Sequence, residues 1–409
     1  MLKFDIFCRV IDHFGDAGVC WRLAKELSGA PFYAEVRLWI DDLPTLQKIT
    51  AQNNQITAAG LPSNASSGHR KLTVHPWPAA NNALENSDWP KPHPIVIEAF
   101  AGGIPAAVRT QLTADHLWIV LDHLSAEKWV SDFHGLPGYA DGLQAQKYYF
   151  YPGFTENTGG LLRQPDLLSQ VQYWQSQTRL TQWQRLAIPL QLDPTSTHQL
   201  ASSTVFFIFQ YPHAPVSALL QSLLQQEPIP PTTILFAADQ DVHYQNAQQL
   251  LRSTMPDSSE PAHLKPASTH APTINLIRLP FVSQQHFDHL LWSTDFNFVR
   301  GEDSWVRALW AQRPFIWQPY PQSECTHLIK LRAWLQRLDL PYAAQKLFWQ
   351  WNSNVPQRVY THNLDITALA PAPLRRWQQC IRHEVHRLRA QEPLSSHLIQ
   401  FCRQKLNSH

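Results

Sequence analysis

The chain has few cysteines, and none stands in a pattern that binds a metal or builds a disulfide framework. They are odd in number, scattered and without a CxxC pair: Cys8, Cys20, Cys325, Cys380 and Cys402. Scattered thiols are typical of proteins in a reducing compartment. The first residues lack the features of a secretion signal, and no apolar run approaches about 18 residues. We therefore expect a cytoplasmic protein with no membrane span.

An excess of charge of one sign is also absent. The 409 residues include 33 basic and 32 acidic ones, giving a formal net charge of +1. Such a balance provides no bulk attraction to nucleic acid or to a membrane surface. The chain contains no GxGxxG fingerprint, P-loop, GxSxG or HExxH motif. These absences argue against NTPases and hydrolases, and we expect no metal and no cofactor.

What the chain does have is two successive sets of alternating strand and helix signals. A chain of this length exceeds one compact core, so two domains are expected. We predict a Rossmann-like domain over 1–190 and a second over 191–370, with 191–203 as the linker between them. The basic helices of 371–409 are predicted to pack across the junction. The polar segments 52–70, 79–93 and 255–272 are predicted loops.

This alternation indicates an α/β protein whose strands pair in parallel. Two Rossmann-like domains facing one another across a cleft describe the GT-B architecture of glycosyltransferases. Open α/β sheets bind ligands at the carboxyl ends of their strands. We therefore expect the functional residues to follow strands.

The segment 299–322 has the strongest chemical signature. A strand-like run turns through Gly301 into a helix-like run, and four functional side chains lie together there: Arg300, Glu302, Asp303 and Ser304. Free N–H groups at the start of a helix and an arginine favour a phosphate. Carboxylates beside an anion site bind hydroxyl groups or move protons, so the combination indicates a nucleotide-sugar site. The alternative is an ion pair between Arg300 and one of the acids.

A second constellation lies in the turn after the first strand. Asp12 and Asp16 bracket a turn that contains Gly15, and a helix is predicted from about residue 16. Acids at the carboxyl edge of a strand provide what a general base requires. The alternative is that Asp16 is the N-cap of the helix.

Two further candidates are aromatic. Phe209 and Tyr211 end the first strand of the second set, where a ring and a phenol can contact a base or a phosphate; the alternative is that both are core residues. Phe281 and Gln284 lie where a loop enters a helix, and such residues can stack on and pair with a nucleobase. The alternative there is ordinary helix capping by Ser283.

Three long segments together resemble one family, the bacterial protein-arginine rhamnosyltransferases that modify elongation factor P. They are 1–27, 147–163 (KYYFYPGFTENTGGLLR) and 298–322 (FVRGEDSWVRALWAQRPFIWQPYPQ). The resemblance implies an inverting, metal-independent GT-B enzyme. It would transfer rhamnose from dTDP-β-L-rhamnose to an arginine of the factor, activating it to rescue ribosomes stalled at polyproline.

The resemblance also implies a role for each candidate residue. Asp16 corresponds to the catalytic aspartate, with Asp12 and Glu302 as further essential acids. The remaining candidates correspond to the binding site for dTDP-rhamnose: Phe209, Tyr211, Phe281, Gln284, Arg300, Asp303 and Ser304. Two other functions stay open: a GT-B enzyme with a small-molecule acceptor, and a non-catalytic binding protein gated by a nucleotide sugar.

Overall fold

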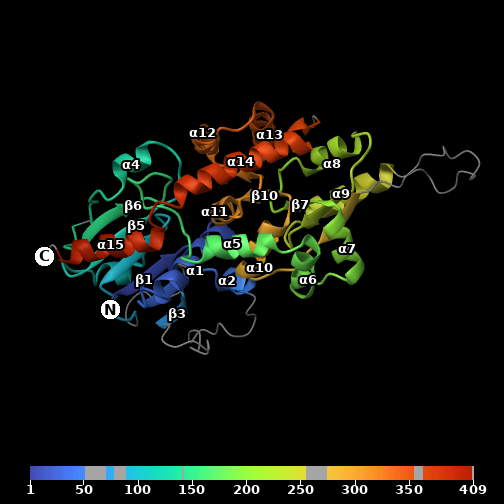
Figure 1. The fold of residues 1–409 in the computed structure, drawn as a ribbon. Helices are drawn as coiled ribbons and strands as arrows, with labels where there is room; N and C mark the ends of the chain where they lie inside the picture. Colours follow the sequence, from blue (N-terminus) through green and yellow to red (C-terminus); the bar gives the residue numbers. More distant parts are fainter. Residues whose placement is uncertain (51–70, 78–88, 141, 255–273, 354–362, 408–409) are drawn as a thin grey trace, which may run out of the picture. The chain divides into compact units, whose positions relative to one another are not determined.

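The computed structural model describes residues 1–50, 71–77, 89–140, 142–254, 274–353 and 363–407. The predicted loops 52–70 and 255–272, and residues 79–88 of the third, lie outside these ranges. The chain forms two compact units (Figure 1). Unit 1 contains Met1–Leu167 and His386–His409, and unit 2 contains Leu168–Val385. Within the described ranges no helix is long and apolar enough to cross a membrane.

Unit 1 is built on a six-stranded sheet in which every pair of neighbouring strands is parallel, in the order β3-β2-β1-β4-β5-β6. Its strands are mostly short apolar runs, as expected for a parallel sheet covered on both faces. In chain order they are β1 (Lys3–Cys8), β2 (Glu35–Ile40), β3 (Lys71–Pro76), β4 (Ile95–Ala99), β5 (Leu117–Leu121) and β6 (Gln146–Phe150). Strand β1 lies inside the sheet between β2 and β4, so the turn that follows it belongs to the middle of the sheet edge.

Helices from both ends of the chain complete unit 1. They are α1 (Phe14–Ser28), α2 (Leu43–Thr50), α3 (Ala106–Arg109), α4 (Trp129–Phe133) and α15 (Leu394–Asn407). The C-terminal helix α15, red in Figure 1, packs with α1 and β5. Its Leu398 and Cys402 are fully buried in the same core as Phe4 and Ile6 of β1.

Unit 2 is built on a five-stranded parallel sheet in the order β11-β10-β7-β8-β9. The strands are β7 (Thr204–Ile208), β8 (Thr232–Phe236), β9 (Ile274–Arg278), β10 (Phe296–Arg300) and β11 (Phe315–Gln318). Helices α8 (Val216–Leu224), α9 (Asp241–Thr254), α10 (Gln284–Ser293) and α11 (Asp303–Trp310) follow strands. The others are α5 (Leu167–Ser176), α6 (Arg179–Leu190), α7 (Pro194–Ser202), α12 (Thr326–Arg337), α13 (Tyr342–Asn352) and α14 (Pro371–Leu388).

The two α/β sheets confirm the predicted fold class, but the observed division differs from the predicted domain limits. Unit 2 begins at Leu168 rather than at 191, because α6 packs against α7 and α10. The predicted linker 191–203 is wrong: most of it is helix α7, whose first residue is Pro194 and whose N-cap is Asp193. Segment 371–409 is divided, with most of α14 in unit 2 and α15 in unit 1. Packing of this segment across the junction stays a prediction.

Candidate active site

The turn after β1 is held together by the carboxylate of Asp16. Its Oδ2 accepts the backbone N–H groups of Ile11 at 2.8 Å and Asp12 at 2.9 Å. Asp16 is only 5% exposed and is the third residue of α1, whose N-cap is His13. The alternative that Asp16 is the N-cap is therefore wrong. It reaches back from the first helical turn and fixes the backbone that carries Asp12.

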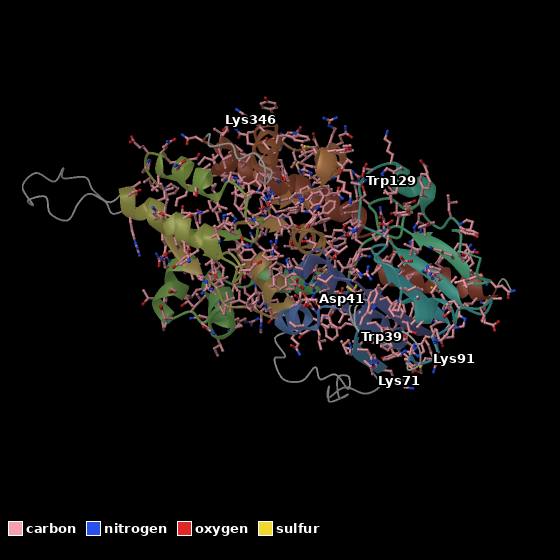
Figure 2. All side chains as sticks on the ribbon, turned by 180° about the vertical axis from the view of Figure 1, so that it is seen from behind. Trp39, Asp41, Lys71, Lys91, Trp129 and Lys346 are labelled. Atoms are coloured by element: carbon pink, nitrogen blue, oxygen red, sulfur yellow. The ribbon has the colours of Figure 1, made fainter. Side chains whose placement is uncertain are left out.

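A third acid, which the sequence did not indicate, supports the same turn. Asp41, labelled in Figure 2, directly follows β2, the neighbour of β1. Its Oδ1 accepts the backbone N–H of Val10 at 2.8 Å. Three consecutive N–H groups, from Val10 to Asp12, are thus each directed at a carboxylate. Parallel pairing of β1 with β2 brings Asp41 to this edge. An acid directly after a predicted strand was the signal that could have revealed it.

Gly15 allows a close approach within the turn. A Cβ atom at this position would lie 2.8 Å from Oδ2 of Asp12, closer than any real contact of this kind. The Gly15 N–H also donates to the carbonyl of Asp12 at 2.7 Å. The glycine therefore makes room for the Asp12 carboxylate.

In unit 2, three of the predicted site residues lie together: Arg300, Phe209 and Tyr211. The guanidinium carbon of Arg300 lies 4.7 Å from the ring centre of Phe209 and 4.8 Å from that of Tyr211. Contacts of this kind between a cation and a ring are attractive. Its Nη2 also pairs with Oδ2 of Asp239 at 2.5 Å, a partner that the sequence did not indicate. The guanidinium is thereby fixed at the carboxyl ends of β7, β8 and β10.

The backbone N–H and the backbone carbonyl of Tyr211 each make a hydrogen bond to a side chain. Its N–H donates to Oε1 of Gln318 at 3.0 Å, and its carbonyl accepts from Nε2 of His243 at 3.0 Å. The Nε2 of Gln318 in turn donates to Nε2 of His213 at 3.0 Å, which requires a neutral imidazole. Burial lowers the pKa of His213 to about 4, so this ring is neutral at physiological pH.

The predicted passage from strand through glycine to helix is confirmed at Gly301. This residue has φ of 63°, a conformation that favours glycine, and it separates β10 from α11. Glu302 is the N-cap residue and Asp303 begins the helix. Ser304 is buried, and its Oγ donates to the carbonyl of Arg300. All four predicted residues of this segment therefore lie around one helix N-terminus.

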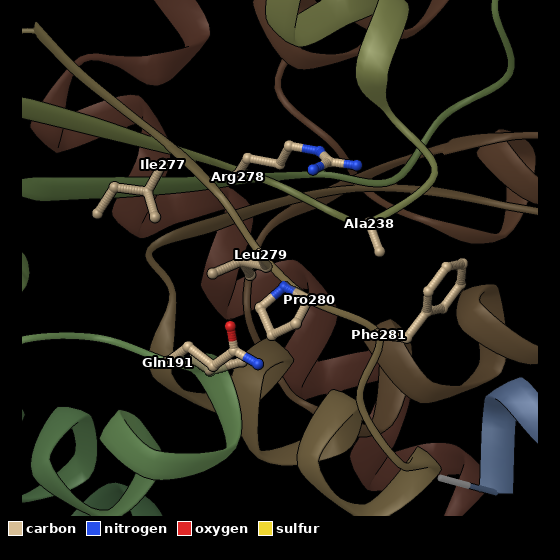
Figure 3. Close-up of a pocket in the computed structure, with 8 residues that line it drawn as sticks. Gln191, Ala238, Ile277, Arg278, Leu279, Pro280 and Phe281 are labelled. Carbon is tan, nitrogen blue, oxygen red and sulfur yellow. The ribbon is translucent and has the colours of Figure 1, made fainter. Parts of the chain in front are cut away.

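A pocket of about 290 Å³ lies at the carboxyl ends of β8 and β9 (Figure 3). Its lining consists of Leu190, Gln191, Ala238, Ile277, Arg278, Leu279, Pro280 and Phe281. Phe281 is 46% exposed, so its ring is accessible to a ligand. The sequence indicated only Phe281 of this set, because the others carry no motif.

Gln284, the second predicted base-binding residue, does not line this pocket. It is the buried first residue of α10 and is 7% exposed. The neighbouring Ser283 is the N-cap, and its Oγ accepts the N–H of His286 at 3.3 Å. The predicted capping role of Ser283 is thus confirmed, and the structure places Phe281 but not Gln284 at the pocket.

In the described ranges, no three His, Cys, Asp or Glu side chains come together as metal ligands. Independence from a metal stays a prediction. Among the described residues, the guanidinium of Arg300 and the positive N-terminal end of α11 lie next to one another.

Two α/β units, each built on a sheet of parallel strands, define the fold of a GT-B glycosyltransferase. A solved structure described as the structural basis for EarP-mediated arginine glycosylation of translation elongation factor EF-P matches with a TM-score of 0.57 and 25% identity, over 99% of each chain. The S. aureus MnaA–UDP structure matches in fold, with a TM-score of 0.50 and 12% identity, over 100% of this chain and 97% of the other.

Sequence comparison identifies the family. The model of Elongation-Factor P (EF-P) rhamnosyltransferase EarP matches residues 4–403. A protein-arginine rhamnosyltransferase of Pseudomonas putida is 34% identical, covering 98% of this chain and 99% of the relative. One from Shewanella oneidensis is 32% identical, covering 98% and 97%. The chain belongs to this family, and it is a glycosyltransferase.

Proposed function

We propose that this enzyme transfers rhamnose from dTDP-β-L-rhamnose to an arginine side chain of elongation factor P, with inversion at the anomeric carbon and without a metal. The relatives named protein-arginine rhamnosyltransferases support the reaction class. The observation that carries the donor assignment is the guanidinium of Arg300, held over Phe209 and Tyr211 at the end of β10. With this acceptor, the reaction takes place in the cytoplasm.

The donor binds to unit 2 in this proposal. Its diphosphate contacts Arg300, Tyr211 and the start of α11 at Asp303 and Ser304, because a guanidinium and the N-terminus of a helix favour phosphate oxygens. Glu302 accepts hydrogen bonds from sugar hydroxyls. The thymine ring enters the pocket of about 290 Å³ and stacks on the exposed ring of Phe281. Phe209 supports the site from beneath Arg300, and Gln284 supports it from the start of α10.

The acceptor chemistry belongs to the turn after β1. An arginine side chain has a pKa above about 12 and is a poor nucleophile while protonated. Asp16 and Asp12 orient the guanidinium, and one of its nitrogens attacks the anomeric carbon opposite the diphosphate. The C–N bond forms as the C–O bond to dTDP breaks, and Asp16 takes the proton late in that step.

Positive charge on the donor side replaces a metal. Negative charge develops on the leaving diphosphate, and preorganised donors at that position lower the barrier. Arg300 and the N–H groups at the start of α11 supply these donors. Addition of EDTA is therefore expected to leave the transfer rate unchanged, whereas a fall in rate that Mg²⁺ restores would contradict metal independence.

Intact-mass spectrometry tests the whole proposal. The enzyme is mixed with dTDP-β-L-rhamnose and elongation factor P, and the factor is expected to gain one deoxyhexose. Arg300→Ala abolishes the gain, while Arg252→Ala, in the last turn of α9, leaves it unchanged. No gain with the natural sequence would overturn the proposal. Transfer to a small molecule alone would indicate another GT-B activity, and binding without transfer would indicate a binding protein.

A further inference from the structure

Asp239 stands beside the guanidinium that we assign to the donor diphosphate. It lies three residues after β8, and its Oδ2 is 2.5 Å from Nη2 of Arg300. The side chains of Arg300 and Asp239 are only 11% and 21% exposed, so water screens this pair weakly. An acid thus occupies one side of the cation that is expected to bind an anion.

A chain of buried amides holds Asp239 in this position. Its Oδ1 accepts from Nε2 of Gln240 at 3.0 Å, and Oε1 of Gln240 accepts the backbone N–H of Gln210 at 3.0 Å. The Oε1 of Gln210 accepts from Nε1 of Trp351 at 2.9 Å. Gln210 and Gln240 are 0% and 3% exposed, so this support is part of the core. Each oxygen of Asp239 therefore has a defined partner.

Two aromatic rings also contact the guanidinium of Arg300. The rings of Phe209 and Tyr211 lie within 5 Å of its central carbon, at 4.7 and 4.8 Å. Between the rings and the carboxylate, Arg300 has little freedom to choose another rotamer. This arrangement orients the cation before any ligand binds, which reduces the entropic cost of binding.

The same carboxylate reduces the attraction of Arg300 for a second anion. A diphosphate at this position interacts with the positive charge of Arg300 and, at slightly greater distance, with the negative charge of Asp239. The two contributions oppose one another. After transfer the leaving group is dTDP, and slow release of a tightly bound product limits turnover in many enzymes. A counter-charge at Asp239 makes release faster.

We propose that Asp239 is a positioning residue that orients Arg300 and weakens the binding of dTDP enough for it to leave. This inference rests on the proposed function, in which Arg300 contacts the diphosphate. It predicts that removing the acid strengthens the binding of dTDP. A residue that only stabilises the fold weakens binding when it is removed.

The test is calorimetric titration of the full-length chain with dTDP and, separately, with thymidine. Asp239→Asn removes the charge and keeps one acceptor oxygen, which can still face Arg300 while the amide nitrogen turns towards Gln240. We expect this variant to bind dTDP about fivefold to tenfold more tightly. Thymidine has no phosphate, so its affinity stays unchanged. In steady-state transfer, product inhibition by dTDP strengthens by the same factor. If Asp239→Asn folds poorly, Asp239→Ser removes the same charge in a smaller side chain. Because serine no longer holds Arg300 in place, we expect it to tighten dTDP binding by less than Asp239→Asn.

Asp365→Asn is the matched control. Asp365 also lies in unit 2, its side chain is 28% exposed, and it pairs with Lys346, which has no part in the proposed donor site, so the variant removes one equal charge from the same unit. Its affinity for dTDP is expected to match that of the natural sequence, and equal tightening would show that only net charge matters and overturn the inference. Unchanged or weaker dTDP binding by the Asp239 variants overturns it as well. Arg300→Ala separates the two claims: if it leaves dTDP binding unchanged, the donor site itself is wrong.

Discussion

One carboxylate oxygen of Asp16 accepts the backbone N–H of Asp12 at 2.9 Å, so the first acid of the turn is positioned by the second. The same oxygen accepts the N–H of Ile11 at 2.8 Å. Asp16 therefore has a structural task in addition to the proton acceptance that we propose for it. The two tasks respond differently to substitution, which makes them separable.

Asp16→Asn and Asp16→Ala are expected to separate these tasks. The amide oxygen of asparagine can still accept both N–H groups, so the fold loses only about 1 kcal/mol, while the transfer rate falls about 10²- to 10⁴-fold with the base. Alanine removes both hydrogen bonds and costs about 3 kcal/mol or more of unfolding free energy. Urea unfolding and intact-mass transfer assays measure the two effects. An asparagine variant with the natural transfer rate would exclude Asp16 as the base.

Gly15→Ala tests the position of the Asp12 carboxylate. The new Cβ would lie 2.8 Å from Oδ2 of Asp12, so this flexible side chain has to move. Alanine is favoured over glycine in a helix by up to about 1 kcal/mol, so the free energy of unfolding is expected to stay equal or rise. The transfer rate is expected to fall roughly tenfold, as for a misplaced catalytic group.

A double-mutant cycle provides the control for this prediction. In an Asp12→Ala background the carboxylate is gone, and Gly15→Ala should have no further effect on transfer. An equal loss in both backgrounds would show that the new methyl group acts through something other than Asp12. Affinity for dTDP, whose proposed contacts all lie in unit 2, is expected to stay constant throughout.

The sequence predicted most strands and the residues that follow them, because short apolar runs alternating with amphipathic segments have a direct physical meaning. Arg300, Phe209 and Tyr211 were found in this way, and the structure brings them together. Strand β6 was missed because it is an edge strand, paired only with β5 among the six strands of its sheet, and four of its five residues are only partly buried. Helix α7 was missed because Asp-Pro, an N-cap and a first helical residue, resembles a turn.

The only sequence signal for Asp41 and Asp239 was their position shortly after a strand, which does not identify the group that each one contacts. Each follows a strand, as many unimportant acids do, and its partner lies 31 or 61 residues away. Only the parallel order of the strands brings Asp41 to Val10 and Asp239 to Arg300. Functional side chains inside a motif were thus predictable, whereas the groups that orient them depended on tertiary pairing.

Asp288 and Arg307 form a buried ion pair that joins α10 to α11. The Nη2 of Arg307 lies 2.6 Å from Oδ2 of Asp288, the Nε lies 3.0 Å from Oδ1, and both residues are at most 5% exposed. Asp288→Ala leaves a buried guanidinium without this partner and is expected to cost about 3–5 kcal/mol of unfolding free energy. Denaturant unfolding measures this loss, and a value below about 1 kcal/mol would contradict the prediction.

The double variant Asp288→Leu/Arg307→Met provides the control. It removes both charges and keeps apolar volume, so it is expected to recover most of the lost stability. Because neither residue is assigned to the ligand, the double variant should bind dTDP within about twofold of the natural sequence at a temperature where both are folded. A much larger loss of affinity would give this pair a direct part in the site.

His289 is expected to make the stability of unit 2 depend on pH. Its ring stacks on Trp174 with centres 4.1 Å apart, and burial lowers the pKa of His289 to about 4. In the unfolded chain the histidine ring takes up a proton near pH 6.5, whereas in the folded protein His289 takes up its proton only near pH 4. The contribution of the neutral His289 ring to the free energy of unfolding is therefore fully present above about pH 6.5, and it is lost progressively as the pH falls towards 4.

His289→Gln is expected to reduce this dependence. The variant loses the stacked ring and is less stable at pH 7.5, but its unfolding free energy should fall less between pH 7.5 and 5 than that of the natural sequence. His198→Gln, at an exposed position of α7, is the matched control and should retain the natural dependence. Denaturant unfolding at the two pH values measures both. If His289→Gln and the natural sequence lose equal stability over this range, the proton uptake that drives the loss occurs at other groups.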